Sequence, residues 1–197
     1  IARPDGLDAL SNLEEWYKVI RDIPDIYSFQ QSRLLELIFQ SQDPAKIIGQ
    51  IPTWVEALRR VPDLETSSFA TIVEILAQSP NSDDLIGRVS GWVEVIKEIP
   101  GINADDVLNL VTLLMKQQHI EAITDVLPGV VQSLASVQVP NNHSTFELRQ
   151  MLNYLIVHPK FARLGTYIPP WIDAMGQIPN FSAESIRTVV QFMFERE

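Results

Sequence analysis

Side chains that could carry out acid–base or metal chemistry are few and scattered in this sequence. There are three histidines, His119, His143 and His158, and no two of them stand four residues apart as the zinc-binding pair of a helix would. Isolated histidines more often occupy surface or capping positions. The chain has no cysteine, which excludes disulfides, zinc–thiolate sites and thiol chemistry.

Two pairs of adjacent acids are a second candidate, Asp83–Asp84 and Asp105–Asp106. Paired carboxylates can bind a metal ion or act as an acid–base pair. Both pairs stand where helices are expected to begin, and acidic side chains there interact favourably with the helix dipole. Because no histidine or third carboxylate beside them completes a site, we favour this structural interpretation.

Motifs for acyl or phosphate chemistry are also missing. The sequence contains neither a GxSxG nucleophile elbow nor a GxxxxGK[ST] loop, and its eight glycines are scattered. Function has to be argued from a site. We therefore predict a non-enzymatic protein without catalytic residues, bound metal or cofactor.

The charge balance bears on the kind of partner. Fifteen Lys and Arg stand against twenty-five Asp and Glu, which gives a formal net charge of −10. Nucleic acids and anionic membranes attract proteins mainly through basic residues, so the composition argues against both. The only adjacent basic pair, Arg59–Arg60, is expected at a solvated helix end. No apolar run approaches the roughly 18 residues of a membrane span, and no signal peptide is visible.

The compartment stays open, with a soluble cytoplasmic protein as the preferred expectation. The chain begins with Ile1 and not with Met, as expected of a processed form or of a fragment of a longer protein. Its composition, with 46% hydrophobic and 20% charged residues, is that of an ordinary globular protein.

The elements that hold these residues follow from an internal repeat. Each of the four tryptophans is followed eight residues later by a proline, in the pairs Trp16–Pro24, Trp54–Pro62, Trp92–Pro100 and Trp171–Pro179. The first three pairs are spaced by 38 residues. Between the third and fourth pairs lies a degraded copy, with Val130 at the tryptophan position and Pro140 two residues late.

Each proline is predicted to separate two helices, helix A before it and helix B after it. Proline and the residue preceding it disfavour helix, which stops helix A. In helix B, apolar residues such as Leu34, Leu35 and Ile38 recur with the spacing of one helix face in every copy. Polar residues stand where an N-cap is needed, namely Ser28, Thr66 or Ser67, Asn103, Ser144 and Ser182.

We therefore predict an all-α fold, a right-handed α-solenoid of five tandem helix-pair repeats of about 38–40 residues. It forms a single domain over residues 1–197. One helix pair cannot bury its apolar face alone, so neighbouring repeats must stack. The tryptophans are expected in that core, and not on a surface for ligand stacking. The repeats are expected at about 7–42, 43–80, 81–118, 119–158 and 159–197.

Prolines also stand two residues before the tryptophan position in three copies, as Pro52, Pro128 and Pro169. Proline kinks or interrupts a helix interior but is accepted in a first turn. We expect helix A to be divided there, in the second repeat into a leading helix near 44–50 and a helix that carries Trp54.

This organisation resembles the HEAT and armadillo families of α-solenoids. The resemblance rests on the helix-pair unit, on the proline within helix A, and on Asp25 and Asp63 just past its end. It covers nearly the whole chain. The Arg that HEAT units usually carry in helix B has no consistent counterpart here, so we predict the architecture and assign no family.

The leading functional hypothesis is a scaffold that binds a protein or peptide, because stacked repeats create extended surfaces. A candidate contact column lies twelve residues past each proline, with the fourth copy shifted, at Glu36, Glu74, Thr112, Asn153 and Gln191. A solvated face without a partner is the alternative for this column. The polar turn 139–144 is a further candidate contact.

Two other functions stay open. A structural spacer or self-association module of a larger protein is suggested by the apolar end around Phe192–Phe194 and by the missing Met. A repeat-type RNA reader is disfavoured by the acidic balance.

Overall fold

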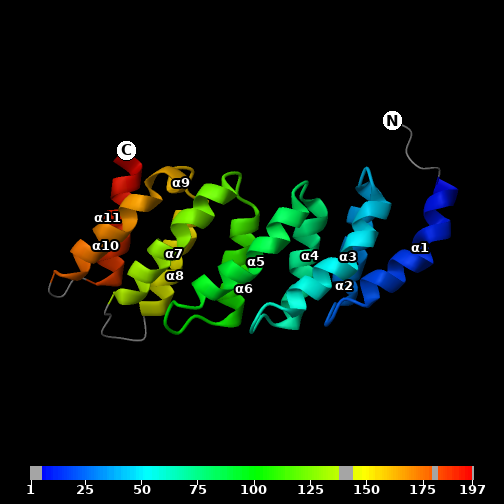
Figure 1. Cartoon of the computed structure of the whole chain (residues 1–197), viewed down its shortest axis with the longest axis horizontal. Coiled ribbons are helices and arrows are strands. Elements are labelled where there is room, and N and C mark those ends of the chain that lie inside the picture. Colours follow the sequence, from blue (N-terminus) through cyan, green and yellow to red (C-terminus); the bar gives the residue numbers. More distant parts are fainter. Residues whose placement is uncertain (1–5, 138–143, 179–181, 197) are drawn as a thin grey trace. The chain divides into compact units, whose positions relative to one another are not determined.

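The computed structural model describes residues 6–137, 144–178 and 182–196, and these residues form helices and turns without any β-strand (Figure 1). The all-α prediction is confirmed. The chain divides into two compact units, Ile1–Ser90 and Gly91–Glu197. No helix in the described ranges has the length and apolarity that crossing a membrane requires.

The first unit is built of two layers of helices. α1 packs on α3 in one layer, and α2 packs on α4 in the other; α1 also contacts α2, and α3 contacts α4. Its elements in chain order are α1 (Gly6–Arg21), α2 (Ser28–Gln40), α3 (Pro44–Arg59), the 3₁₀ helix η1 (Thr66–Ser68), α4 (Phe69–Gln78) and the start of α5 (Ser82–Ile96).

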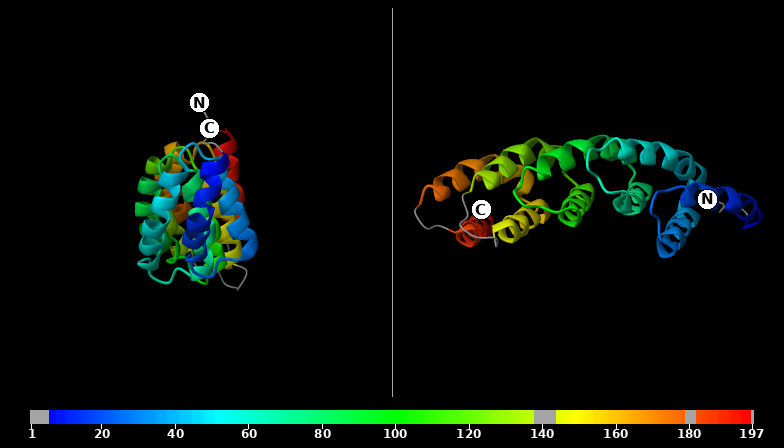
Figure 2. Two further views of the ribbon diagram at one scale, coloured as in Figure 1. Left: turned by 90° about the vertical axis from the view of Figure 1, so that its right-hand side faces the viewer. Right: turned by 90° about the horizontal axis from the view of Figure 1, so that it is seen from below.

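The second unit has the same two-layer construction. α7 and α10 pack together in one layer, and α6, α8 and α11 follow one another in the other (Figure 2). This packing of A helices on A helices and of B helices on B helices is compatible with a helical repeat. After the end of α5 its elements are α6 (Ala104–Met115), α7 (Ile120–Ser136), α8 (Ser144–Val157), α9 (Phe161–Leu164), η2 (Gly165–Tyr167), α10 (Ile168–Gly176) and α11 (Ala183–Arg196).

Helix A ends before the proline in the three copies where both are described. α1 ends at Arg21, α3 at Arg59 and α5 at Ile96, three or four residues before Pro24, Pro62 and Pro100. This stop follows from the steric exclusion of proline and of its predecessor from the helix. Pro140 and Pro179 lie outside the described residues.

The residue after each of these prolines adopts a left-handed backbone conformation. The φ angle is 52° at Asp25, 58° at Asp63 and 76° at Gly101. Only Gly, Asn and Asp enter this region readily. The corresponding residues of the other two copies, Asn141 and Asn180, share this tolerance by type and lie outside the described residues. The alternation of Asp, Gly and Asn is thus a second marker of the repeat, set by backbone conformation.

The predicted N-caps are confirmed at two positions. Asn103 Oδ1 accepts a hydrogen bond from the backbone N–H of Asp106 at 2.8 Å, and Ser182 Oγ accepts one from Ser185 at 3.1 Å. The prediction was wrong at Ser28, which is the first residue of α2; there Tyr27 is the N-cap, and its N–H donates to Gln30 Oε1 at 3.0 Å.

The remaining cap candidates differ from expectation as well. Thr66 and Ser67 lie within η1, and the N-cap position of α4 is taken by Ser68 without a side-chain cap bond. The hydroxyl of Thr66 instead donates to the Asp25 carboxylate, which links the turns that follow α1 and α3. Ser144 is the first residue of α8.

The expected division of helix A at its internal proline is wrong in the second and fourth copies. α3 continues through Pro52, and α7 continues through Pro128. A proline in a helix interior costs about 3 kcal/mol. In α3 the burial of Ile51, Trp54 and Val55 around it offsets that cost, because each apolar side chain contributes roughly 1.5–3 kcal/mol when buried.

The division does occur in the fifth copy. There α9 gives way to η2, and Pro169 stands in the first turn of α10, where its missing N–H has no helical partner to lose. Pro170 follows directly. Gly165, in η2, is buried so closely against α7 that a Cβ there would lie 2.5 Å from Val126 Cγ2.

Candidate binding surfaces

The tryptophans belong mostly to the core. Trp16, Trp54 and Trp92 are 7%, 1% and 1% exposed. Trp171 is half-buried and stacks on Tyr167 with ring centroids 6.1 Å apart. The described chain therefore does not present them as a common stacking surface for a ligand.

The predicted contact column does not form one exposed row. Glu36 is exposed, and its Oε1 accepts a hydrogen bond from Gln40 at 3.0 Å. Glu74 is only 7% exposed. Thr112, Asn153 and Gln191 are half-buried. A partner-binding role for the five residues stays a prediction, with Glu36 the most accessible of them.

Glu74 is engaged inside the first unit. Its Oε2 lies 3.1 Å from Nε of Arg33, so the pair joins α4 to α2. Burial raises the pKa of the Glu74 carboxyl, and the Arg33 guanidinium lowers it by a smaller amount. Glu74 thus links two B helices through Arg33 and has little surface left for a partner.

Thr112 and Asn153 differ in the hydrogen bonding of their side chains. The Thr112 hydroxyl donates to the Asn109 carbonyl at 2.8 Å on the same helix. Asn153 Oδ1 is buried and has no hydrogen-bond partner within the described ranges. A buried acceptor without a partner costs about 1–3 kcal/mol.

Both pairs of adjacent acids lie in first helical turns, as predicted. Asp84 accepts two hydrogen bonds from Arg88, and Asp83 accepts one from Gln50 at 3.0 Å. Asp106 has a further role, because it is buried and forms an ion pair with Arg149 of α8. The described residues contain no cluster of three potential metal ligands.

The two described histidines stand at helix ends. His119 is the exposed N-cap residue of α7 and makes no side-chain cap bond. His158 Nδ1 accepts a hydrogen bond from the Lys160 backbone N–H at 3.2 Å, and burial lowers its pKa, with Lys160 adding to the effect. His143 and the segment 139–143 lie outside the described residues.

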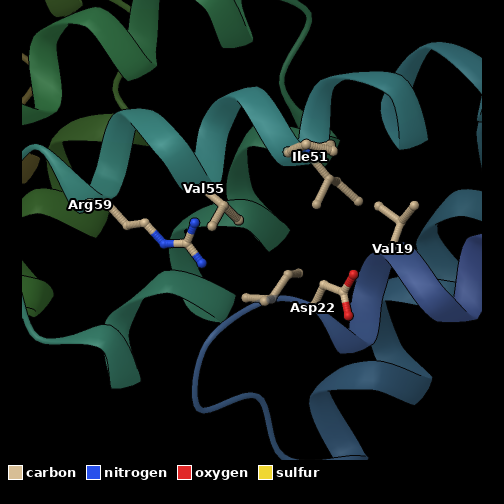
Figure 3. Close-up of a pocket in the computed structure, with 7 residues that line it drawn as sticks. Val19, Asp22, Ile51, Val55 and Arg59 are labelled. Carbon is tan, nitrogen blue, oxygen red and sulfur yellow. The ribbon is translucent and has the colours of Figure 1, made fainter.

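An open groove between α1 and α3 was not anticipated from the sequence. It has a volume of about 460 Å³, and the aliphatic residues Ile23, Ile51 and Val55 among its lining are buried. Asp22 at the end of α1 and Arg59 at the end of α3 lie on its two sides (Figure 3). The residues that line it are Val19, Asp22, Ile23, Ile51, Pro52, Val55 and Arg59.

The charged side chains that line this groove are one acid and one base, Asp22 and Arg59. Arg59 and Arg60 share one carboxylate, that of Glu56, at 3.7 Å and 3.2 Å. Lys18 and Arg21 line a separate hollow on α1 together with Glu14 and Glu15. Neither they nor Asp22 forms an ion pair with any residue whose side chain is described. The Arg59–Arg60 pair does stand at an exposed helix end, as predicted.

Comparisons with protein-family models, with curated protein sequences and with solved structures find no match for this chain.

Proposed function

We propose that this chain is a non-enzymatic scaffold, a right-handed HEAT-like α-solenoid of five helix-pair repeats that binds a protein or peptide. The observation that supports it is the layered packing within each unit, where A helices lie on A helices and B helices on B helices. In such a stack each helix buries one face against its neighbours, and its outer face can contact a partner.

Exposed aromatic side chains on these outer faces favour a protein partner. Aromatic residues are enriched in protein interfaces, because they offer large contact areas at low entropic cost. Tyr27 and Phe29 stack with ring centroids 5.9 Å apart and are 60% and 69% exposed. Phe146 and Phe192, on α8 and α11, are 53% and 50% exposed.

The test is affinity capture from the native source with the chain as bait, read by mass spectrometry. We expect one protein to be recovered in stoichiometric amount. A second bait carries Glu36→Ala, Thr112→Ala and Gln191→Ala; it leaves out the buried Glu74 and also Asn153, whose Oδ1 is buried, so that the fold is kept. Undiminished capture by this bait would exclude the contact column, and no capture by either bait would contradict the scaffold.

Self-association is the second candidate, and the exposed apolar side chains of the second unit favour it. Phe192, Ile178 and Val157 are each about half exposed. Sedimentation velocity over a range of concentrations tests it. A species that stays monomeric at high concentration would count against this function.

A further inference from the structure

Consecutive A helices contact one another through two different apolar faces. In the first unit, Val19 and Ile23 of α1 lie across the groove from Ile51 and Val55 of α3 (Figure 3). We call the face of α1 the forward face, because it contacts the A helix that follows in the chain. The face of α3 is the backward face. In the second unit α10 likewise packs on α7.

The backward face is uncovered on α1. Tyr17, one residue after the tryptophan, is 44% exposed. The residues at this position in the other four copies are at most 5% exposed, namely Val55, Val93, Val131 and Ile172. Leu13 is half-buried, whereas its counterparts are at most 1% exposed, namely Ile51, Val89, Leu127 and Ile168. α1 thus presents to solvent a surface that the other A helices bury.

The forward face is uncovered on α10. Ile178 is 50% exposed, whereas its counterparts in the first three copies are at most 7% exposed, namely Ile23, Val61 and Ile99. Ala174 is exposed, whereas its counterparts in those copies are half-buried, namely Val19, Ala57 and Val95. α10 therefore leaves open the same face through which α1 contacts α3.

The B helix of the first copy also has an open backward face. The ion pair between Arg33 of α2 and Glu74 of α4 identifies a forward and a backward position of the B helices. Phe39 stands three residues after Glu36, the counterpart of Glu74, so it lies on the backward face. Phe39 is 45% exposed, whereas its counterparts in the last three copies are at most 5% exposed, namely Met115, Ile156 and Phe194.

The B helix of the fifth copy has an open forward face. Thr188 of α11 is the counterpart of Arg33 and is exposed. Phe192 stands four residues later on the same face and is 50% exposed. The first helix pair thus exposes the backward face in both layers, and the last helix pair exposes the forward face in both layers.

The polar positions of the two open faces do not oppose like charges. Asp22 and Arg59 lie on the two sides of the groove between α1 and α3, and their counterparts on the open faces are Gln177 and Arg21. In the B helices, Thr188 takes the place of Arg33 opposite Glu36. Like charges that oppose one another across an interface disfavour association. The two faces can therefore meet without repulsion.

We propose that copies of this chain associate head to tail, with the forward face of α10 and α11 on the backward face of α1 and α2 of a second copy. This inference rests on the helix-pair repeats of the proposed function, and it names the surface of the self-association candidate. Ala174 and Ile178 of one copy lie against Tyr17 of the next, and Phe192 lies against Phe39. The two faces differ, so the contact is heterologous and leaves one face of each copy open for another.

The experiment is sedimentation velocity of the full chain over a range of concentrations. Tyr17→Asp places a charge on the backward face, and Ile178→Asp places one on the forward face. Phe146→Asp, at an exposed aromatic position of α8, is the matched control. Circular dichroism melts verify that every variant is folded.

We expect the average mass of wild type and of Phe146→Asp to rise with concentration in the same way. Tyr17→Asp and Ile178→Asp should each associate at least about tenfold more weakly, because a buried charge opposes the contact. An equimolar mixture of these two variants should form a dimer that grows no further. Tyr17→Asp supplies the intact forward face of that dimer, and Ile178→Asp supplies the intact backward face.

A gain of affinity tests the alignment of the B helices. Thr188→Arg places an arginine opposite Glu36 of the next copy, as Arg33 lies opposite Glu74 within the first unit. We expect it to strengthen association by up to about fivefold, the effect of an exposed ion pair. Adding Glu36→Gln to the same chain should abolish the gain.

Three results would overturn the inference. A wild-type chain that stays monomeric would remove the association, and capture of a partner from the native source would then still support the scaffold. Association that Tyr17→Asp and Ile178→Asp leave unchanged would keep self-association but place its surface elsewhere. A mixture of the two variants that stays monomeric, while wild type associates, would exclude the head-to-tail arrangement.

Discussion

Trp54 and Trp92 stand at the same position of successive A helices and differ by one hydrogen bond. Trp92 Nε1 donates to Thr124 Oγ1 at 3.0 Å, whereas Trp54 Nε1 is buried without a partner in the described chain. The residue that corresponds to Thr124 in the preceding repeat is Ile86, which has no acceptor. Tryptophan is therefore present at this position because its indole packs in the core. The hydrogen bond of Nε1 is an additional interaction in one copy.

Replacing a tryptophan by alanine should cost more stability at a buried position than at a half-buried one. We expect Trp54→Ala to lower the free energy of unfolding by about 3–5 kcal/mol, because it removes a large and fully buried side chain. Trp171→Ala is the control and should lower it by less, since Trp171 is only half-buried. Guanidinium denaturation measures both values, and equal losses would contradict the assigned burial.

Glu74 gives stability a pH dependence of defined sign. Burial raises the pKa of its carboxyl above the ordinary value of 4.5, so the folded chain binds this proton more tightly than the unfolded chain does. The contribution of the group is therefore fully present below about pH 4.5 and is lost as pH rises through the folded-state pKa. The glutamine side chain of Glu74→Gln is uncharged throughout this pH range, so the variant should not lose stability in this way as pH rises.

The measurement is the melting temperature of wild type and Glu74→Gln at several pH values from about 4 to about 7. The variant should gain stability relative to wild type as pH rises. If the melting temperature of Glu74→Gln relative to wild type stays constant or falls as pH rises, the Arg33 guanidinium, and not burial, has the larger effect on the pKa of the Glu74 carboxyl. Glu36→Gln, at an exposed position, serves as the control.

At the level of secondary-structure elements, ion pairs connect consecutive B helices within each unit. In the first unit Arg33 joins α2 to Glu74 of α4; in the second unit Asp106 joins α6 to α8, and Glu147 joins α8 to Arg187 of α11 at 3.1 Å. The partners come from successive helix pairs, with Asp106 and Arg149 43 residues apart. These pairs fix the alignment of one B helix on the next.

The packing of η2 on α7 depends on a missing side chain. A Cβ at Gly165 would lie 2.5 Å from Cγ2 and 2.8 Å from Cβ of Val126, and a valine side chain has few rotamers with which to yield. We expect Gly165→Ala to lower the free energy of unfolding by about 1–3 kcal/mol. The double variant with Val126→Ala should recover part of that loss in a double-mutant cycle.

Gly129→Ala is the matched control for this element. A Cβ there would lie 3.6 Å from Pro169 Cγ, which is an ordinary contact, and replacing glycine within α7 should stabilise by about 0.5–1 kcal/mol. Additive effects of Gly165→Ala and Val126→Ala would contradict the close contact between η2 and α7.

For the whole molecule, the proposed solenoid predicts an extended particle. A compact chain of this length has a radius of gyration of about 16 Å, and a linear stack of repeats exceeds it. We expect small-angle X-ray scattering of the monomer to give a value clearly above about 16 Å. A value at the compact limit would contradict the solenoid and would leave the two-layer packing within each unit unaffected.

The sequence alone determined the features that depend on near neighbours. The spacing of tryptophan and proline predicted the ends of helix A, and the Asn103 and Ser182 caps could be read from residue type, because proline sterics and capping act over a few residues. The positive φ of Asp25, Asp63 and Gly101 could have been predicted in the same way, from the recurrence of Asp, Gly and Asn after the proline.

Tertiary structure decided the rest, because burial and pairing depend on residues one repeat away. Pro52 stays inside a continuous α3 since the buried side chains beside it outweigh its lost hydrogen bond. Glu74 is buried since Arg33 of the preceding B helix lies against it. The groove between α1 and α3 exists since two helices more than twenty residues apart in sequence pack with a gap, and no local pattern encodes the distance between them.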